Sequence, residues 1–282
     1  MKNNYITCFL FSSIFYSLNI FADISGNPGE IIPLKASNSD KENNLTVQIE
    51  GSLYKLIPLP YEKQDSSINI DGQSIFIKKK DFGESRITIK NDSMVNLNKK
   101  DSERAYKESQ IIREALNVYS KSLEPNLDFI SPVNGIISSK YGKRRFINDQ
   151  PRSPHLSLDI AASEGTKVIS PSKGKIILIG EFFYAGNFII IDHGYGLLSS
   201  YSHLSKVSVK ENEIVNKGQK IGEVGSTGRV TGPHLHWTVY LNKVRINPEL
   251  HSTKISGQDI ISLMREKQSK LTMRYLKSIN WN

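Results

Sequence analysis

Short alternations of apolar and polar residues characterise the chain between residues 23 and 97. They occur in runs at residues 45–50, 67–70 and 85–90, separated by polar stretches rich in turn-forming residues. In the last run, Ile87 and Ile89 alternate with polar neighbours, which is the period of a strand with one buried face. This pattern predicts a small β-sandwich-like domain over residues 23–97. The segment contains no histidine, and its acidic residues are dispersed.

The hydrophobic period becomes helical between Asn98 and Leu123. Asp101 or Ser102 can act as the N-cap of this helix, and Pro125 ends the pattern. The apolar residues share one helical stripe: Ala105, Ile112, Leu116 and Tyr119. We therefore predict a helical connector over residues 98–127.

Longer apolar runs predict strands in residues 128–250. These runs are residues 174–180, 187–192, 197–203 and 234–241. Glycine-bearing turns separate them at short intervals, which favours antiparallel sheets over alternating strands and helices. The prediction is a mainly β chain in which an antiparallel β-sheet domain over residues 128–250 follows the smaller domain. Residues 251–282 have an amphipathic pattern and are expected to form a C-terminal helix.

Residues 1–22 have the character of a secretory signal peptide. Lys2 precedes an apolar run from Tyr5 to Phe21, and the small residue Ala22 follows it. The alternative is a retained membrane anchor, but the run is shorter and more interrupted than the roughly 20 apolar residues of a spanning helix. Cys8, the only cysteine, lies within this segment, so a metal on the mature chain would be held by histidines and carboxylates. We expect export to the periplasm or cell envelope.

The charge of the chain adds a preference for anionic partners. Its 282 residues carry a formal net charge of +9. For an exported protein, such a charge favours a cell-wall polymer, a membrane surface or a nucleic acid. The lysines and arginines are scattered, apart from residues 78–80 and 144–145, and no nucleic-acid-binding motif is present. We therefore expect no nucleic-acid partner.

Two short motifs contain candidate metal ligands. Residues two apart in a strand point to the same side, so His234 and His236 would share one face, as would His155, Ser157 and Asp159 if that segment is extended. A His-x-His pair alone is weak evidence for a metal site. A histidine and a carboxylate combined with a distant histidine, however, form a ligand set of catalytic zinc, which keeps a fourth position for water.

Three motifs in order give residues 129–250 a resemblance to a known family. The motifs are His155-Leu-Ser-Leu-Asp159, Tyr201-Ser-His203-Leu and Ser226-Thr-Gly-Arg-Val-Thr-Gly-Pro-His234-Leu-His236. With the flanking segment 139–145, they resemble the catalytic domain of the LytM/lysostaphin-type zinc peptidases of family M23. Ser157 departs from the glycine that is usual in the family. Its hydroxyl is expected to crowd the metal or to bond a ligand without abolishing metal binding.

The resemblance implies roles for five residues. Zinc (Zn2+) would be held by His155, Asp159 and His236, whereas His203 and His234 would be catalytic. In such a site zinc activates water, one histidine transfers protons to the leaving amine, and the other stabilises the charge on the tetrahedral oxygen. The sequence does not divide the last two tasks between the two histidines.

The implied activity is hydrolysis of peptide cross-links in bacterial cell-wall peptidoglycan, at D-alanyl–diaminopimelate bonds. Peptidoglycan peptide stems would be the substrate, and proteins of cell-wall synthesis or other wall hydrolases are the candidate partners. The alternative is a non-catalytic LytM-type domain that binds or activates another hydrolase. Such domains typically lose metal ligands, whereas all five positions are filled here. Because the N-terminal domain lacks catalytic features, we also expect it to cover the active-site groove and keep the enzyme latent.

Other notable residues have simpler interpretations. His193 lies beside a glycine turn and is predicted to be structural, and His251 is expected at the solvated surface. The glycine-rich segment 222–228 lacks the Lys-Ser/Thr ending of a phosphate-binding loop and is predicted to be the turn before the His-x-His strand. Arg229, beside that turn, is predicted to be a surface arginine, with contact to a substrate carboxylate as the alternative.

Overall fold

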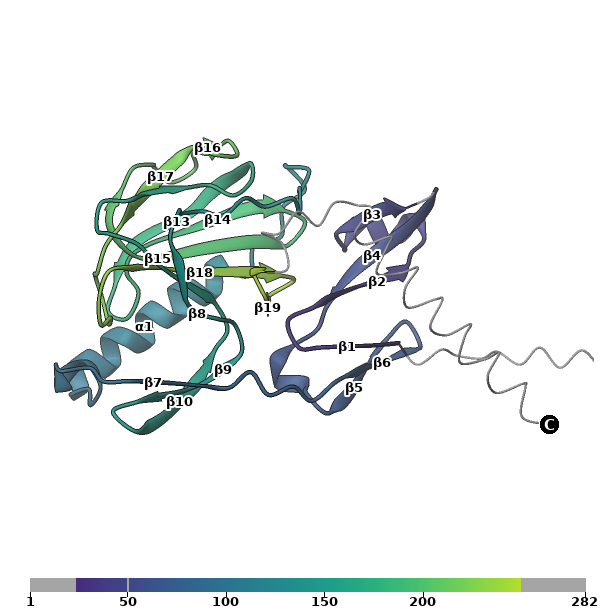
Figure 1. The fold of residues 1–282 in the computed structure, drawn as a ribbon. Helices are drawn as coiled ribbons and strands as arrows, with labels where there is room; N and C mark the ends of the chain where they lie inside the picture. Colours follow the sequence, from purple (N-terminus) through teal and green to yellow (C-terminus); the bar gives the residue numbers. More distant parts are fainter. Residues whose placement is uncertain (1–23, 50, 250–282) are drawn as a thin grey trace, which may run out of the picture.

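The computed structural model describes residues 24–49 and 51–249 (Figure 1). The predicted signal peptide, the predicted C-terminal helix and His251 lie outside the described residues. The described chain is mainly β with antiparallel sheets and a single α-helix, which confirms the predicted fold class. Within these two ranges, no helix has both the length and the apolar character needed to cross a membrane.

Two three-stranded sheets form the N-terminal part of the molecule. Their strand orders are β1-β6-β5 and β2-β4-β3. The strands are β1 (Ile24–Gly26), β2 (Ile31–Lys35), β3 (Thr46–Ile49), β4 (Ser52–Pro58), β5 (Ser66–Ile70) and β6 (Gln73–Ile77). Buried aliphatic side chains from both sheets form one cluster: Ile32, Leu34, Ile57, Leu59, Ile75 and Ile77. This shared core explains the alternating pattern of the N-terminal sequence.

The next strand joins the N-terminal part to the rest of the chain. β7 (Glu84–Ile87) pairs in parallel with β9 (Lys143–Ile147), which in turn pairs with β10 (Gln150–His155). Ile89 follows β7 and packs on Ile147 of β9. The strand predicted at residues 85–90 is therefore shared between the two predicted domains. The boundaries of the two predicted domains remain a prediction.

The helical connector contains α1 (Lys99–Ala115). Asn98 is its N-cap, because the Asn98 side chain accepts a hydrogen bond from the backbone nitrogen of Asp101 at 2.9 Å. The predicted caps, Asp101 and Ser102, instead lie inside the first turn. The end of the helix packs on a cluster of β13 and β14 through Ile112, Ala115 and Leu116. In Figure 1, α1 accordingly lies against the large sheet.

The largest sheet has ten strands and carries the predicted motifs, except for His155, which lies on β10. Its main path is β16-β13-β14-β15-β18-β11-β8, and β12, β17 and β19 are attached to it. The strands are β8 (Ile136–Ser139), β11 (Leu158–Ala161), β12 (Lys167–Ile169), β13 (Gly174–Phe182), β14 (Gly186–Gly194), β15 (Leu197–Val207), β16 (Ile214–Val215), β17 (Lys220–Val224), β18 (His234–Leu241) and β19 (Val244–Ile246). Since β18 lies between β11 and β15, the three motifs become neighbours.

Candidate metal centre

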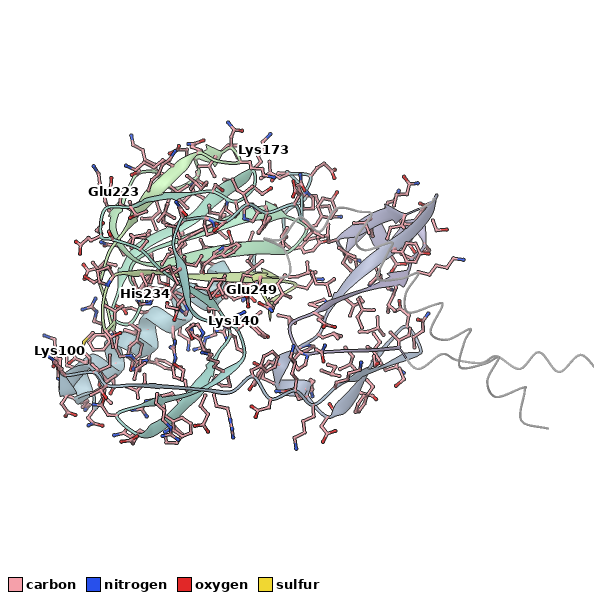
Figure 2. The ribbon with its side chains drawn as sticks, in the orientation of Figure 1. Lys100, Lys140, Lys173, Glu223, His234 and Glu249 are labelled. Atoms are coloured by element: carbon pink, nitrogen blue, oxygen red, sulfur yellow. The ribbon has the colours of Figure 1, made fainter. Side chains whose placement is uncertain are left out.

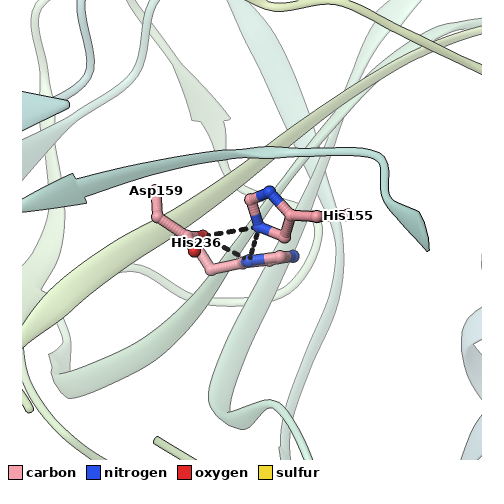
Figure 3. A group of neighbouring side chains, drawn as sticks. All are labelled: His155, Asp159 and His236. Carbon is pink, nitrogen blue, oxygen red and sulfur yellow. Dashed lines mark hydrogen bonds and ion pairs between the residues drawn. The ribbon is translucent and has the colours of Figure 1, made fainter. Parts of the chain in front are cut away.

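Three side chains from β10, β11 and β18 converge on one point (Figure 3). His155 Nε2 lies 3.0 Å from Asp159 Oδ1, and His236 Nδ1 lies 2.6 Å from the same oxygen. The two ring nitrogens are 3.3 Å apart. One potential ligand atom from each of these three residues lies within 4.8 Å of the other two. Two imidazole nitrogens and a carboxylate oxygen arranged in this way fit a catalytic metal site with three protein ligands.

Strand register explains how two of these residues meet. Asp159 on β11 and His236 on β18 are direct cross-strand partners. The parity predicted for β18 is confirmed, because Leu235 and Trp237 are buried in the core cluster on the opposite face. Of the turn predicted at residues 222–228, residues 222–224 instead end β17, and residues 225–228 lie in the connection between β17 and β18.

A hydrogen bond determines which nitrogen of His155 faces the centre. Its Nδ1 donates to the backbone carbonyl of Lys140 at 3.1 Å. Because a carbonyl oxygen can only accept, Nδ1 carries the proton and Nε2 keeps a free lone pair. Fixing a metal-binding histidine through its second nitrogen is common in metal sites.

The departure at Ser157 does not disturb this arrangement. Its side chain is buried, and its Oγ lies 2.7 Å from Thr238 Oγ1 on the neighbouring strand. The hydroxyl therefore pairs with another hydroxyl, and this partner is not one of the predicted ligands.

The local charges suit metal binding. Burial raises the pKa of Asp159, but its close contacts with His236 and His155 outweigh burial and hold this pKa well below its usual value. Burial also lowers the pKa of His236 to about 4. At neutral pH, Asp159 is therefore an anion and His236 is neutral, which are the protonation states that metal coordination requires.

His203 reaches the same centre through a β-bulge. Between two register pairs, Asn187 with Leu204 and Ile189 with Tyr201, β15 spans one residue more than β14. His203 has φ = 65°, in the left-handed region, and Tyr201 and Leu204 both enter the core cluster. The extra residue turns the His203 side chain away from the core. The strand predicted to end at His203 in fact continues to Val207.

The two predicted catalytic histidines lie side by side. Their ring centroids are 4.8 Å apart, and the His203 ring is 5.7 Å from that of His236. His203 Nδ1 donates to the carbonyl of Thr227 at 2.9 Å, and His234 Nδ1 donates to the carbonyl of Gly232 at 2.9 Å. Each ring therefore keeps Nε2 free as an acceptor.

These two histidines differ in exposure. Burial, reinforced by neighbouring histidines, lowers the pKa of His203 to about 3, so its imidazole is neutral at pH 7. His234, at the start of β18 (Figure 2), is less buried, and its Nε2 lies 4.0 Å from Asp159 Oδ1. The structure thus brings all five residues predicted from the motifs into one cluster.

A cleft of about 860 Å³ lies beside this cluster, with His155 and His236 in its lining. Val95, Asn96 and Leu97, which precede α1, form part of one wall. The last residues of the predicted N-terminal domain therefore border the cleft. The latent state expected from the sequence remains a prediction.

The sequence motifs did not identify two of the four arginines that line this cleft. Its lining includes four arginines: Arg145, Arg152, Arg229 and Arg245. Arg229 is half-buried, and its guanidinium lies 4.1 Å from the centroid of the Tyr184 ring, unlike the predicted surface arginine. No local pattern marks Arg152 or Arg245, because β10 and β19 contribute to one cleft only in the folded chain. The sequence offered a signal for the other two arginines: Arg145 belongs to the flanking segment 139–145, and contact with a substrate carboxylate was the alternative for Arg229.

His193 has the structural role predicted for it. It is fully buried, its Nδ1 donates to the carbonyl of Lys173 at 2.8 Å, and its Nε2 lies 2.8 Å from Ser199 Oγ. Burial lowers its pKa to about 4. The ring is therefore a neutral, hydrogen-bonded part of the core at pH 7.

The β fold and the His/Asp cluster are those expected of a metal-dependent hydrolase, and comparison with known proteins shows which family this part of the chain resembles. Residues 153–248 match Peptidase family M23. This range contains all five clustered residues. This part of the chain is therefore similar to the peptidase domain of family M23.

Named relatives agree with this assignment. The chain is 40% identical over 112 residues to the peptidoglycan DD-endopeptidase ShyA of Vibrio cholerae, covering 39% of this chain and 26% of the relative. It is 36% identical over 135 residues to the DD-carboxypeptidase/endopeptidase Mpg of Neisseria meningitidis, covering 47% of this chain and 31% of the relative. The match thus spans about a quarter to a third of these relatives.

A solved structure is similar over a larger part of the chain. It is a protein from Pseudomonas aeruginosa described as a peptidase M23, with 28% sequence identity and a TM-score of 0.60. The similarity covers 80% of this chain and 94% of that one. The shared architecture therefore extends beyond the residues matched by the family.

Proposed function

We propose that this chain is a zinc-dependent endopeptidase that hydrolyses peptide cross-links of bacterial peptidoglycan, at D-alanyl–diaminopimelate bonds. The observation that carries the proposal is the convergence of His155 Nε2, Asp159 Oδ1 and His236 Nδ1 beside two further histidines. The names of the Vibrio and Neisseria relatives support the choice of substrate.

The donor set fits zinc. Two imidazoles and one carboxylate form a common ligand set of catalytic zinc, and three protein ligands leave a position for water or substrate. His155, Asp159 and His236 would hold the ion, with His155 oriented by the carbonyl of Lys140. When bound, zinc polarises the scissile carbonyl and makes water nucleophilic near neutral pH.

His203 and His234 supply the remaining chemistry in this proposal. Both have Nδ1 bound to a backbone carbonyl, so their rings are held in fixed orientations with Nε2 available. One Nε2 accepts a proton from water and delivers it to the leaving amine. The other ring stabilises the negative charge that develops on the carbonyl oxygen.

Location in the bacterial envelope is part of the same proposal. The predicted signal peptide and the net charge of +9 suit a protein that works on an acidic wall polymer. Substitution of the ligands tests the enzymatic role against that of a non-catalytic activator. His155→Ala and His236→Ala should each abolish release of cross-link fragments from purified peptidoglycan, and undiminished release would contradict the proposal.

A further inference from the structure

The cleft beside the candidate metal centre is lined by positive charge without matching negative charge. Its four arginines come from β9, β10, the β17–β18 connection and β19: Arg145, Arg152, Arg229 and Arg245. Among the described residues that line the cleft, none is an aspartate or a glutamate. We call these four residues the arginine cluster.

Two members of the cluster have only neutral partners for their charge. Arg152 Nη2 donates to Gln150 Oε1 at 2.6 Å and to the carbonyl of Val95 at 3.5 Å. Arg229 Nη1 donates to the carbonyl of Met94 at 3.4 Å. Hydrogen bonds to neutral oxygen atoms hold the guanidinium groups in position but leave their charges uncompensated.

A third member has an unused donor. Arg145 Nη2 lies 3.9 Å from Asp159 Oδ2, while its buried Nε has no hydrogen-bond partner in the described part of the chain. A buried N–H without an acceptor is unfavourable and uncommon in native proteins. Arg145 therefore places a guanidinium group with an unsatisfied donor next to Asp159.

Besides burial, the positive charges of neighbouring arginines also lower the pKa of Arg229. Burial lowers the pKa of Arg229, and the nearby charges of Arg145 and Arg152 act in the same direction. Like charges gathered in a partly desolvated cleft repel one another, so an anion bound between them would be stabilised. Guanidinium groups pair especially well with carboxylates, through two parallel hydrogen bonds.

We propose that the arginine cluster binds carboxylate groups of an acidic peptide and thereby positions its scissile bond at the metal centre. This inference rests on the proposed function and narrows it. Stems that contain glutamate and diaminopimelate carry free carboxylates close to the cross-link, whereas a cross-bridge made of glycine carries none. The cluster therefore selects directly cross-linked acidic stems and marks Arg152 and Arg229 as specificity-determining residues.

The test uses two substrates and three forms of the full-length protein. The substrates are a cross-linked stem-peptide dimer and the same dimer with its carboxylates converted to amides. The proteins are the unsubstituted chain, the double variant Arg152→Gln/Arg229→Gln, and Arg113→Gln, which removes an exposed arginine of α1 outside the cleft. Melting temperatures establish that all three are folded.

We expect the unsubstituted chain and Arg113→Gln to cleave the acidic dimer with a kcat/KM about tenfold or more above that for the amidated dimer. The double variant should lose this preference by becoming slower on the acidic dimer alone. A double variant that keeps the preference, or that slows equally on both dimers, would overturn the inference.

Binding separates this inference from the proposed function. Calorimetry of the acidic and amidated monomeric stem peptides with the zinc-loaded protein requires no turnover. Tighter binding of the acidic peptide that disappears in the double variant supports the proposed role of the arginine cluster, even if no dimer is cleaved. Absence of cleavage would instead reject the endopeptidase activity. Equal binding of both peptides by the unsubstituted chain would reject the arginine cluster.

Discussion

Asp159 and His236 are direct cross-strand partners on β11 and β18, and Asp159 Oδ1 lies 2.6 Å from His236 Nδ1. The pairing of two strands that are distant in sequence thus brings together two of the three candidate ligands. His155 completes it from the end of β10.

Replacing Asp159 with Asn should remove the anionic ligand and keep the shape of the side chain. We expect zinc affinity to fall by more than about 100-fold, because even residues that only support metal ligands contribute 10–100-fold. Competition with a zinc indicator measures this affinity. Asp149→Asn is the matched control, since Asp149 is exposed and pairs with Arg86 rather than with a predicted ligand. Equal affinities in the two variants would exclude Asp159 as a ligand.

The hydroxyl of Ser157 should matter for stability and leave metal binding unchanged. Ser157→Ala leaves Thr238 Oγ1 without its buried partner, which we expect to cost about 1 kcal/mol of unfolding free energy. Zinc affinity should remain within about threefold, because the hydroxyl does not contact the ligands. Urea unfolding of Ser157→Ala, Thr238→Val and the double variant measures the coupling between the two hydroxyls. A large loss of zinc affinity in Ser157→Ala would show that the hydroxyl supports the metal.

The bulge at His203 allows its chemistry to be separated from its backbone geometry. Asparagine tolerates left-handed backbone better than most residues, so His203→Asn should keep the fold and the zinc content. Loss of the imidazole should lower kcat by about 100-fold or more. Zinc analysis, melting temperature and kcat on cross-linked dimers give the three readouts. Wild-type kcat in this variant would remove His203 from the catalytic machinery.

Sequence periodicity accounted for much of the centre but not for His203. The alternation of β18 correctly placed Leu235 and Trp237 in the core and the two histidines on the other face. The same rule applied to β15 would place His203 beside Tyr201 in the core. A bulge depends on pairing with β14, and nothing local to the sequence of β15 announces it.

The arginine cluster and the N-cap of α1 likewise could not be predicted from the local sequence. Local sequence placed a helix after residue 98, but only the fold shows that Asn98 rather than Asp101 caps it. Arg152 and Arg229 lie 77 positions apart and reach one cleft through the tertiary structure. Motifs therefore predicted the centre of the site, and the fold added its charged surroundings.

His193 should make stability depend on pH. Its pKa of about 4 in the fold lies below the ordinary value of 6.5, so the unfolded chain binds more protons between these pH values. The contribution of His193 to stability is present above pH 6.5 and is lost as the pH falls toward 4, by an amount on the order of 3 kcal/mol.

The variant His193→Gln isolates this effect. A glutamine amide can still donate to the carbonyl of Lys173 and accept from Ser199, but it does not titrate. Urea unfolding with a chelator present, between pH 6.5 and 4, should show a shallower loss of stability in the variant. Identical pH slopes in the two proteins would contradict a buried, neutral His193.

Peptidoglycan digestion with metal removal and restoration tests the central claim most directly. Purified protein is incubated with peptidoglycan alone, after chelation, and after chelation followed by added zinc, and the released fragments are identified by mass. We predict that fragments cut at D-alanyl–diaminopimelate cross-links appear in the first sample, vanish in the second and return in the third. Undiminished release after verified removal of the metal, or no release in any sample, would contradict a zinc endopeptidase centred on His155, Asp159 and His236.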